Sequence, residues 1–212
     1  TKIKNKLFFL VKKKNIIDRI VFSSVVPEIY KKFSFFFKSY LNIKIVEIKK
    51  LKLSRLIDIK VNKKQVGSDR LANSIGALSL SNNFIIIDFG TATTFDVVIK
   101  KKYLGGIISP GINLSLNTLS SKASLIPVIN LKKISNVIGK NTNEAVRSGF
   151  YWGYAGLIDN MIKLIKRQTK SAFKVILTGG LADLYKNSIN TKCKVDKDLT
   201  IKGIIKITKN LT

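Results

Sequence analysis

The stretch IIIDFGTATTFDVV, residues 85–98, constrains the fold more than any other part of the chain. Three isoleucines lead directly into Asp88, a Gly-Thr turn follows, and a second apolar run begins after it. Two short apolar runs on either side of such a turn predict adjacent strands. The turn itself is either a tight hairpin with its polar residues in water, or a cradle in which short side chains let backbone N–H groups and hydroxyls approach an anion.

The composition is that of a globular protein, since 45% of the 212 residues are hydrophobic and the mean hydropathy is +0.14. Such a chain can form one large domain or two small ones. No apolar run approaches the roughly 18 residues of a membrane span, and the N-terminal apolar stretch is too short for a signal peptide. Cys193 is the single cysteine, which fits a reducing compartment. We therefore expect a cytoplasmic protein with no membrane partner.

Histidine is absent from the sequence, and this restricts the chemistry. The Ser-His-Asp arrangement and nearly every zinc site are excluded. Any proton transfer must use Asp, Glu, Lys or Tyr.

The chain is strongly basic, with 39 Lys+Arg against 12 Asp+Glu and a net charge of +27. Such a charge is typical of proteins that bind nucleic acid or anionic membranes. However, the excess is almost all lysine spread along the whole chain, whereas readers of phosphates and bases rely on arginine. We interpret the charge as a general amino-acid bias and expect no specific nucleic-acid partner.

Hydrophobic spacing and turn residues predict strands that alternate with helices, which is typical of an α/β or α+β fold. The predicted strands cover 18–26, 43–48, 83–89, 94–99, 103–109 and 173–177. The predicted helices cover 27–40, 69–80, 113–122 and 143–168, and a further helix follows the Thr-Gly-Gly turn. Thr142 is the expected N-cap of the helix over 143–168.

Three glycine-containing loops stand beside an acid or a hydroxyl, namely VGSDR (66–70), DFGTATT (88–94) and LTGGLADL (177–184). The first could be a simple helix cap, or it could place a base beside a cation that holds a substrate carboxylate. An aspartate at the end of an apolar strand is costly unless it is ligated. The third loop could be only a turn. None of the three is a P-loop, and the chain has no G-x-G-x-x-G.

The order of these motifs resembles that of the type III pantothenate kinase family, through the strings VGSDRLANS, IDFGTATTFDVV, YLGGIISPGI, GKNT with SGFYWGY, and LTGGLA. The resemblance runs from SSVVP at residue 23 to the closing VDKDLTIKGI. It implies the architecture of the acetate/sugar kinase–Hsp70–actin superfamily, in which two RNase H-like domains flank an ATP cleft. Residues 1–83 would then be the incomplete N-terminal domain, and residues 84–212 the C-terminal domain.

The resemblance also implies a reaction, the ATP-dependent phosphorylation of pantothenate, and roles for individual residues. Asp69 would be the general base toward the pantothenate hydroxyl. Gly67, Ser68 and Arg70 would share the pantothenate site, with Arg70 pairing its carboxylate. The cofactors implied are Mg²⁺, which accompanies ATP, and a monovalent cation, K⁺ or NH₄⁺.

Three further positions are implied on the ATP side and at a subunit interface. Asp88 would bind the monovalent cation, and Thr91 would contact ATP. Thr142 would reach the substrate of a second subunit in a homodimer. The helix that follows carries three glycines and the aromatic string FYWGY, a combination expected where two helices pack closely across a two-fold interface.

Two departures from the family pattern accompany the resemblance. Family members begin with a strand that ends in D-x-G-N-T, whose Asp organises Mg²⁺ and ATP, whereas this chain lacks the motif and starts with Thr. We expect a few dozen N-terminal residues to be missing. Lys60 and Lys63 stand where many relatives have Tyr and Pro, which alters part of the pantothenate pocket. The alternative hypothesis is a non-catalytic homologue or truncated fragment with a regulatory or binding role.

Overall fold

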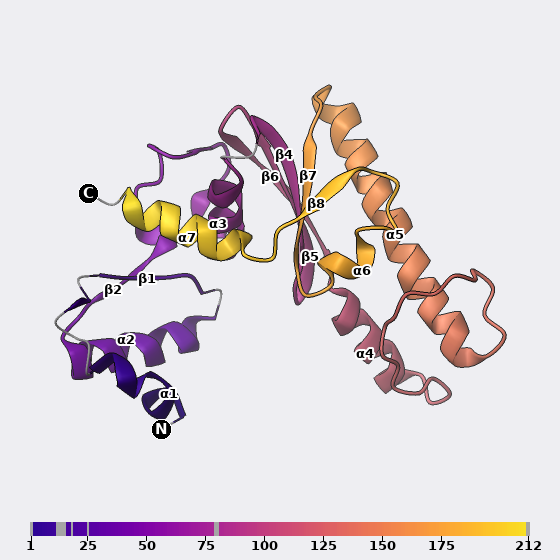
Figure 1. Ribbon diagram of the computed structural model, residues 1–212, viewed down its shortest axis with the longest axis horizontal. Helices are drawn as coiled ribbons and strands as arrows, with labels where there is room; N and C mark the ends of the chain where they lie inside the picture. The colour runs from indigo at the N-terminus through magenta and orange to yellow at the C-terminus, as the bar shows by residue number, and fades with distance from the viewer. Residues whose placement is uncertain (1, 12–15, 18, 25, 79–80, 211–212) are drawn as a thin grey trace. The chain divides into compact units, whose positions relative to one another are not determined.

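The computed structural model describes residues 2–11, 16–17, 19–24, 26–78 and 81–210 (Figure 1). Contacts between Cα atoms divide the chain into two units, Thr1–Ser79 with Leu199–Thr212, and Leu80–Asp198. Both units mix strands and helices, so the expected α/β class is confirmed. The assignment of residues 1–83 and 84–212 to two RNase H-like domains stays a prediction.

The first unit builds a small parallel pair of strands with helices around it. Its elements are α1 (Lys2–Val11), β1 (Ile20–Phe22), α2 (Pro27–Leu41), β2 (Ile45–Glu47), β3 (Asp58–Ile59), α3 (Ser68–Ala77) and α7 (Leu199–Lys209), with 3-10 turns at Ile48–Lys50 and Lys63–Gln65. Strands β1 and β2 are parallel, and α2 connects them. Helix α2 begins at Pro27, as the sequence predicts, because proline lacks the N–H that a first helical turn leaves unpaired.

Helix α3 is held by the C-terminal helix α7, although the two are far apart in the sequence. A Cβ at Gly203 of α7 would stand only 1.8 Å from the carbonyl oxygen of Ala72 in α3. Thr200 Oγ1 donates a hydrogen bond of 2.6 Å to Asn73 Oδ1. Both residues on α3 are fully buried. This packing makes the N-terminus of α3 a rigid support for the side chains that it carries.

The second unit contains one sheet with its strands in the order β6–β5–β4–β7–β8. Its elements are β4 (Asn83–Phe89), β5 (Ala92–Ile99), β6 (Lys102–Pro110), α4 (Ile112–Lys122), α5 (Thr142–Thr169), β7 (Lys174–Gly179), α6 (Ala182–Tyr185) and β8 (Cys193–Val195). Strands β4, β5 and β6 are antiparallel neighbours, while β4, β7 and β8 run parallel. The predicted strands on both sides of the Gly-Thr turn and the long helix after residue 142 are confirmed.

Helix α5 lies along one face of this sheet, as Figure 1 shows. Buried isoleucines of α5, such as Ile158 and Ile162, pack in one cluster with Ile85, Ile87 and Leu177 of the sheet. Phe84 and Ile86, which alternate with these residues along β4, are also fully buried. A strand that is buried on both faces reads as a nearly continuous hydrophobic run.

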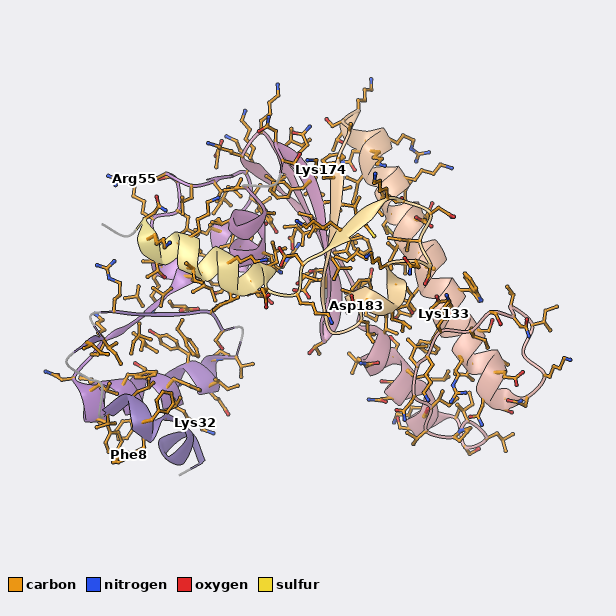
Figure 2. The ribbon with its side chains drawn as sticks, in the orientation of Figure 1. Phe8, Lys32, Arg55, Lys133, Lys174 and Asp183 are labelled. Carbon is orange, nitrogen blue, oxygen red and sulfur yellow. The ribbon has the colours of Figure 1, made fainter. Side chains whose placement is uncertain are left out.

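The turn between β4 and β5 and the loops that follow β6 and β7 lie at the same end of the sheet. Phe89 at the end of β4 is in register with Gly179 at the end of β7. Ala92 at the start of β5 is in register with Pro110 at the end of β6. Two residues labelled in Figure 2 help to locate this end of the sheet. Lys174 is the first residue of β7 and lies at the opposite end, whereas Asp183 lies in α6, which follows the loop after β7. Within the described residues, no helix is long and apolar enough to cross a bilayer.

Candidate active site

The N-terminus of α3 holds the carboxylate of Asp69 in a defined position. Asp69 Oδ1 accepts a 2.8 Å hydrogen bond from the backbone N–H of Arg70. A Cβ at Gly67 would stand 2.3 Å from this same oxygen, so a larger residue there would force the carboxylate out of this position. Asp69 also lies in the first turn of the helix, where the exposed N–H groups favour negative charge. The motif G-x-D-R thus places a fixed acceptor at a helix N-terminus.

Ser68 provides a polar group beside this carboxylate. It is the first residue of α3, and its side chain is fully buried. Its Oγ has no hydrogen-bond partner among the residues that the structure describes. A buried hydroxyl without a partner is uncommon in folded proteins, and a bound polar ligand is one explanation for it. Arg70 is half-buried on the same turn.

The two lysines that depart from the family pattern are both engaged within the first unit. Lys60 Nζ lies 2.7 Å from Asp58 Oδ2 in an ion pair with both side chains about half exposed. Lys63 Nζ donates a hydrogen bond to the carbonyl oxygen of Leu51. Burial lowers the pKa of the Lys63 ammonium. The ammonium groups of these lysines therefore have local partners, and neither is needed to explain the geometry around Asp69.

The second unit places Asp88 against the loop that follows β7. Asp88 is half-buried and in register with Thr178. Gly179 has a φ of +86°, and a Cβ there would stand 2.6 Å from Asp88 Oδ1. The next residue, Gly180, donates its N–H to the carbonyl oxygen of Phe89 at 3.1 Å. The Thr-Gly-Gly loop, which by sequence could be only a turn, therefore forms one wall of the site around Asp88.

Residues 88–94 do form a hairpin, because β4 and β5 pair antiparallel with Phe89 opposite Thr93. The turn contains Gly90 and Thr91, both exposed, and Gly90 donates its N–H to Ala92 O at 3.1 Å. The hairpin therefore presents an exposed hydroxyl and short side chains directly beside Asp88. A carboxylate beside an exposed hydroxyl offers oxygen ligands to a small cation, and the short side chains leave room for a phosphate.

Thr142 is exposed at the start of α5, but it is not the N-cap that the sequence analysis predicted. Asn141 caps the helix, since its Oδ1 accepts a 3.0 Å hydrogen bond from Glu144 N. Glu144 Oε2 in turn accepts a 2.9 Å bond from Lys140 N. The prediction was one residue off because both Asn and Thr are good caps, and Asn is the better of the two. These two hydrogen bonds fix the start of α5, with Thr142 as the first helical residue.

A groove of about 480 Å³ lies beside α5, on the face that carries the glycines. It is lined by Pro110, Leu119, Val146, Gly149, Phe150, Gly153, Tyr154 and Leu157. In the part of the chain that the structure describes, and apart from the adjoining residues and backbone of α5 itself, no atom lies within 4 Å of a Cβ built at Gly149, Gly153 or Gly156. Thr142 stands one turn before Val146, on the same face of the helix. These three glycines, which were predicted to permit close helix packing, therefore have no other helix of the described chain packed against them.

The predicted site residues fall into two groups and one separate position. Gly67, Ser68, Asp69 and Arg70 lie together in the first unit. Asp88 and Thr91 lie together in the second unit, and Thr142 stands apart at the start of α5. In the described ranges, no group of three or more His, Cys, Asp or Glu side chains is arranged to hold a metal ion. Mg²⁺ needs only one or two carboxylates when it also binds substrate phosphates.

Sequence reasoning missed two contacts that shape the second group. It noted the glycines of the Thr-Gly-Gly loop but not that Gly179 lies against Asp88, which depends on the parallel pairing of β4 and β7. It also gave no role to Tyr185, whose ring stacks on Phe89. No local pattern around residue 185 signals this contact.

Residues 2–164 match the family model described as type III pantothenate kinase. A type III pantothenate kinase of Pelagibacter ubique is 58% identical over 196 residues, which are 92% of this chain and 79% of that protein. One from Cereibacter sphaeroides is 44% identical over 144 residues, covering 67% of this chain and 56% of that protein. One from Sulfurihydrogenibium is 38% identical and covers 91% of this chain and 77% of its own.

Among solved structures, a conserved protein from Campylobacter jejuni assigned to the Baf family of transcriptional activators has a similar fold. The TM-score is 0.60 at 19% identity, and the match covers 94% of this chain and 87% of that one. At this identity the likeness concerns the fold alone.

Proposed function

The chain belongs to the type III pantothenate kinase family, and we propose that it phosphorylates pantothenate with Asp69 as the general base and Asp88 and Thr91 on the ATP side. The reaction is ATP-dependent and yields 4′-phosphopantothenate in the first step of coenzyme A biosynthesis. The observation that carries the assignment of the base is the carboxylate of Asp69, held at the N-terminus of α3 beside an unpartnered buried hydroxyl.

Asp69 takes the proton of the pantothenate hydroxyl while the hydroxyl oxygen attacks the γ-phosphorus of ATP. The bond between the γ-phosphorus and the oxygen that bridges the β- and γ-phosphates breaks, and ADP leaves. A carboxylate suits this task in a chain without histidine, because phosphoryl transfer depends mainly on positioning and on stabilising negative charge. Arg70, on the same turn, is suited to pair with the pantothenate carboxylate through its planar guanidinium. Ser68 offers its buried hydroxyl as a further hydrogen-bond donor.

On the ATP side, the hairpin 88–94 and the Thr-Gly-Gly loop are suited to hold phosphates and a cation. Asp88 supplies a negative charge for the cation, and the peptide groups of the hairpin and of the Thr-Gly-Gly loop supply dipoles close to the phosphates. Thr91 supplies an exposed hydroxyl at the turn. A monovalent cation, K⁺ or NH₄⁺, held by Asp88 would supply positive charge near the phosphates, and Mg²⁺ would enter with ATP. We place the reaction in the cytoplasm, where ATP is available and a lone thiol stays reduced.

The groove beside α5 supports a homodimer in which a second copy of the chain covers the glycine face. Helix faces that carry Gly149 and Gly153 allow a partner helix to approach closely, and Phe150 and Tyr154 supply apolar area. Thr142 shares that face, so a partner seated there would come close to it. This geometry supports the proposal that Thr142 acts on the substrate of the partner subunit.

The replacement Asp69→Asn tests the assignment. Asparagine keeps an oxygen that can accept the Arg70 N–H and caps a helix equally well, but it cannot accept a proton from the substrate. We expect kcat for pantothenate phosphorylation to fall by about 10²–10⁴-fold. The circular dichroism spectrum and the melting temperature should be unchanged.

Glu28→Gln is the matched control, because Glu28 is an exposed carboxylate in the first turn of α2 in the same unit. It should leave the rate unchanged. An Asp69→Asn variant with near-normal turnover would remove Asp69 from the role of base and leave it a residue of the first turn of α3. A wild-type chain that is folded but without any kinase activity would favour the alternative, a non-catalytic homologue or truncated fragment.

A further inference from the structure

Tyr185 stands directly behind the turn that we assign to the ATP phosphates. It is the last residue of α6, and its side chain is fully buried. Its ring lies 5.3 Å from the ring of Phe89, with the two planes only 13° apart. Phe89 is 5% exposed and sits in the sequence between Asp88 and the Gly90-Thr91 turn. The residue that Tyr185 supports is therefore part of the site itself.

The Tyr185 ring is also fixed by residues of the long helix α5. The ring stacks on Tyr151, with centroids 5.7 Å apart and an interplanar angle of 29°. The hydroxyl donates a 3.0 Å hydrogen bond to the carbonyl oxygen of Phe150. Burial raises the pKa of Tyr185, so the hydroxyl stays protonated and remains a donor. Tyr151 is held in turn by a hydrogen bond between its hydroxyl and Ser188 Oγ.

The segment that carries Tyr185 contacts Phe89 twice. Gly180 donates its N–H to the Phe89 carbonyl at 3.1 Å, and five residues later the Tyr185 ring covers the Phe89 ring. Backbone and side chain of Phe89 are thus both held by one short stretch. A shift of Tyr185 would move Phe89, and with it the carboxylate of Asp88 on one side and Thr91 on the other.

We propose that Tyr185 is a positioning residue for the phosphate turn, transmitting the fixed position of α5 through the stacked rings of Tyr151, Tyr185 and Phe89 to Asp88 and Thr91. The proposal rests on the function assigned above to Asp88 and Thr91. Tyr185 touches neither ATP nor the cation in this role. It fixes the backbone positions of Asp88 and Thr91, the two residues that would make those contacts.

The test compares Tyr185→Leu with Tyr185→Phe in the full chain. Leucine removes the stacked ring, and we expect the KM for ATP and the K⁺ concentration for half-maximal activation to rise about three- to tenfold, the factor that one aromatic pair contributes. The kcat at saturating ATP and K⁺ should change less. Phenylalanine keeps the stack and loses only the hydroxyl, so it should restore both constants to near the wild-type values.

Hydrogen–deuterium exchange gives a second readout that needs no catalysis. Amides of residues 88–91 should exchange faster in Tyr185→Leu and at the wild-type rate in Tyr185→Phe. Ile165→Ala is the matched control, since Ile165 is buried in the same cluster but lies 14 residues, or about 21 Å, beyond Tyr151 along α5. It should lower the melting temperature without changing exchange at 88–91 or the KM for ATP.

A folded Tyr185→Leu variant with unchanged KM, unchanged K⁺ dependence and unchanged exchange at 88–91 would overturn the proposal and leave Tyr185 an ordinary core residue. If Tyr185→Leu does not fold, Phe89→Leu removes the same stack from the other side and must show the same changes. An inactive wild-type chain would count against the proposed function, while the exchange comparison would still decide the role of Tyr185.

Discussion

At the scale of single residues, the site depends on a few positions where backbone geometry admits only one kind of side chain. Gly179 has a positive φ and lies against the carboxylate of Asp88, whereas its neighbour Gly180 has open space around it among the described residues. The two glycines look equivalent in the sequence. Only position 179 requires glycine, because of both its backbone conformation and the lack of space for a side chain.

Gly179→Ala should therefore destabilise the protein, and Gly180→Ala should not. A left-handed backbone at a non-glycine residue costs about 1–3 kcal/mol, and the new methyl group would also press on Asp88. The Gly180→Ala change should stay within about 0.5 kcal/mol of the wild type, because nothing meets its Cβ. Urea unfolding of both variants measures the difference. Equal stability of the two variants would contradict the conformation assigned to Gly179.

At the scale of secondary-structure elements, α5 has two faces with different tasks. One face packs into the core through residues such as Ile158 and Ile162. The other carries Gly149 and Gly153 along an open apolar groove. Glycines in a helix cost up to about 1 kcal/mol each relative to alanine, so three of them need a compensating role. Close approach of a second copy supplies one.

Gly153→Leu tests this role. The monomer should stay folded, because no described atom lies within 4 Å of the added Cβ. The proposed dimer should dissociate, since the new side chain fills the groove that the partner helix would occupy. Light scattering measures the mass, and pantothenate kinase activity should fall together with it.

Lys163→Leu is the control for that experiment, at an exposed position of α5 six residues beyond the last groove residue, Leu157. It adds a leucine to the same helix and should leave the mass unchanged. An active wild-type monomer at nanomolar concentration would refute both the interface and the role of Thr142 in a shared site.

At the scale of the whole molecule, the dominant property is the net charge of +27. The residues labelled Lys32, Arg55, Lys133 and Lys174 in Figure 2 are all exposed and come from separate segments of the chain. Charge distributed in this way attracts polyanions weakly over much of the surface.

Binding to duplex DNA should accordingly be non-specific and sensitive to salt. We expect measurable binding at about 50 mM salt and its loss by about 200 mM, because each phosphate contact releases a condensed counterion. Fluorescence anisotropy with two unrelated duplexes measures both effects. Tight binding at the higher salt that distinguishes the two sequences would overturn the interpretation of the charge as a general bias.

The sequence by itself determined the elements with a strong local pattern. Helix α2 after Pro27, the strands β4, β5 and β6 around their turns, and the long helix α5 were all predicted, because hydrophobic period, proline and glycine act within a few residues. The motifs around Asp69 and Asp88 were also visible, since an acid beside glycine stands out against an apolar strand or a helix start.

Only the tertiary structure decided which of these pieces support one another. Helix α7 packs on α3 through Thr200 and Asn73, which are 127 residues apart, and no local pattern reports such a contact. Asn141 and not Thr142 is the cap, because Asn141 Oδ1 accepts the N–H of Glu144 while the Glu144 carboxylate accepts the N–H of Lys140. The stacking of Tyr185 on Phe89 depended on the parallel pairing of β4 with β7. Each is a contact through space, whereas sequence periodicity reports only which face of an element is buried, and not which neighbour buries it.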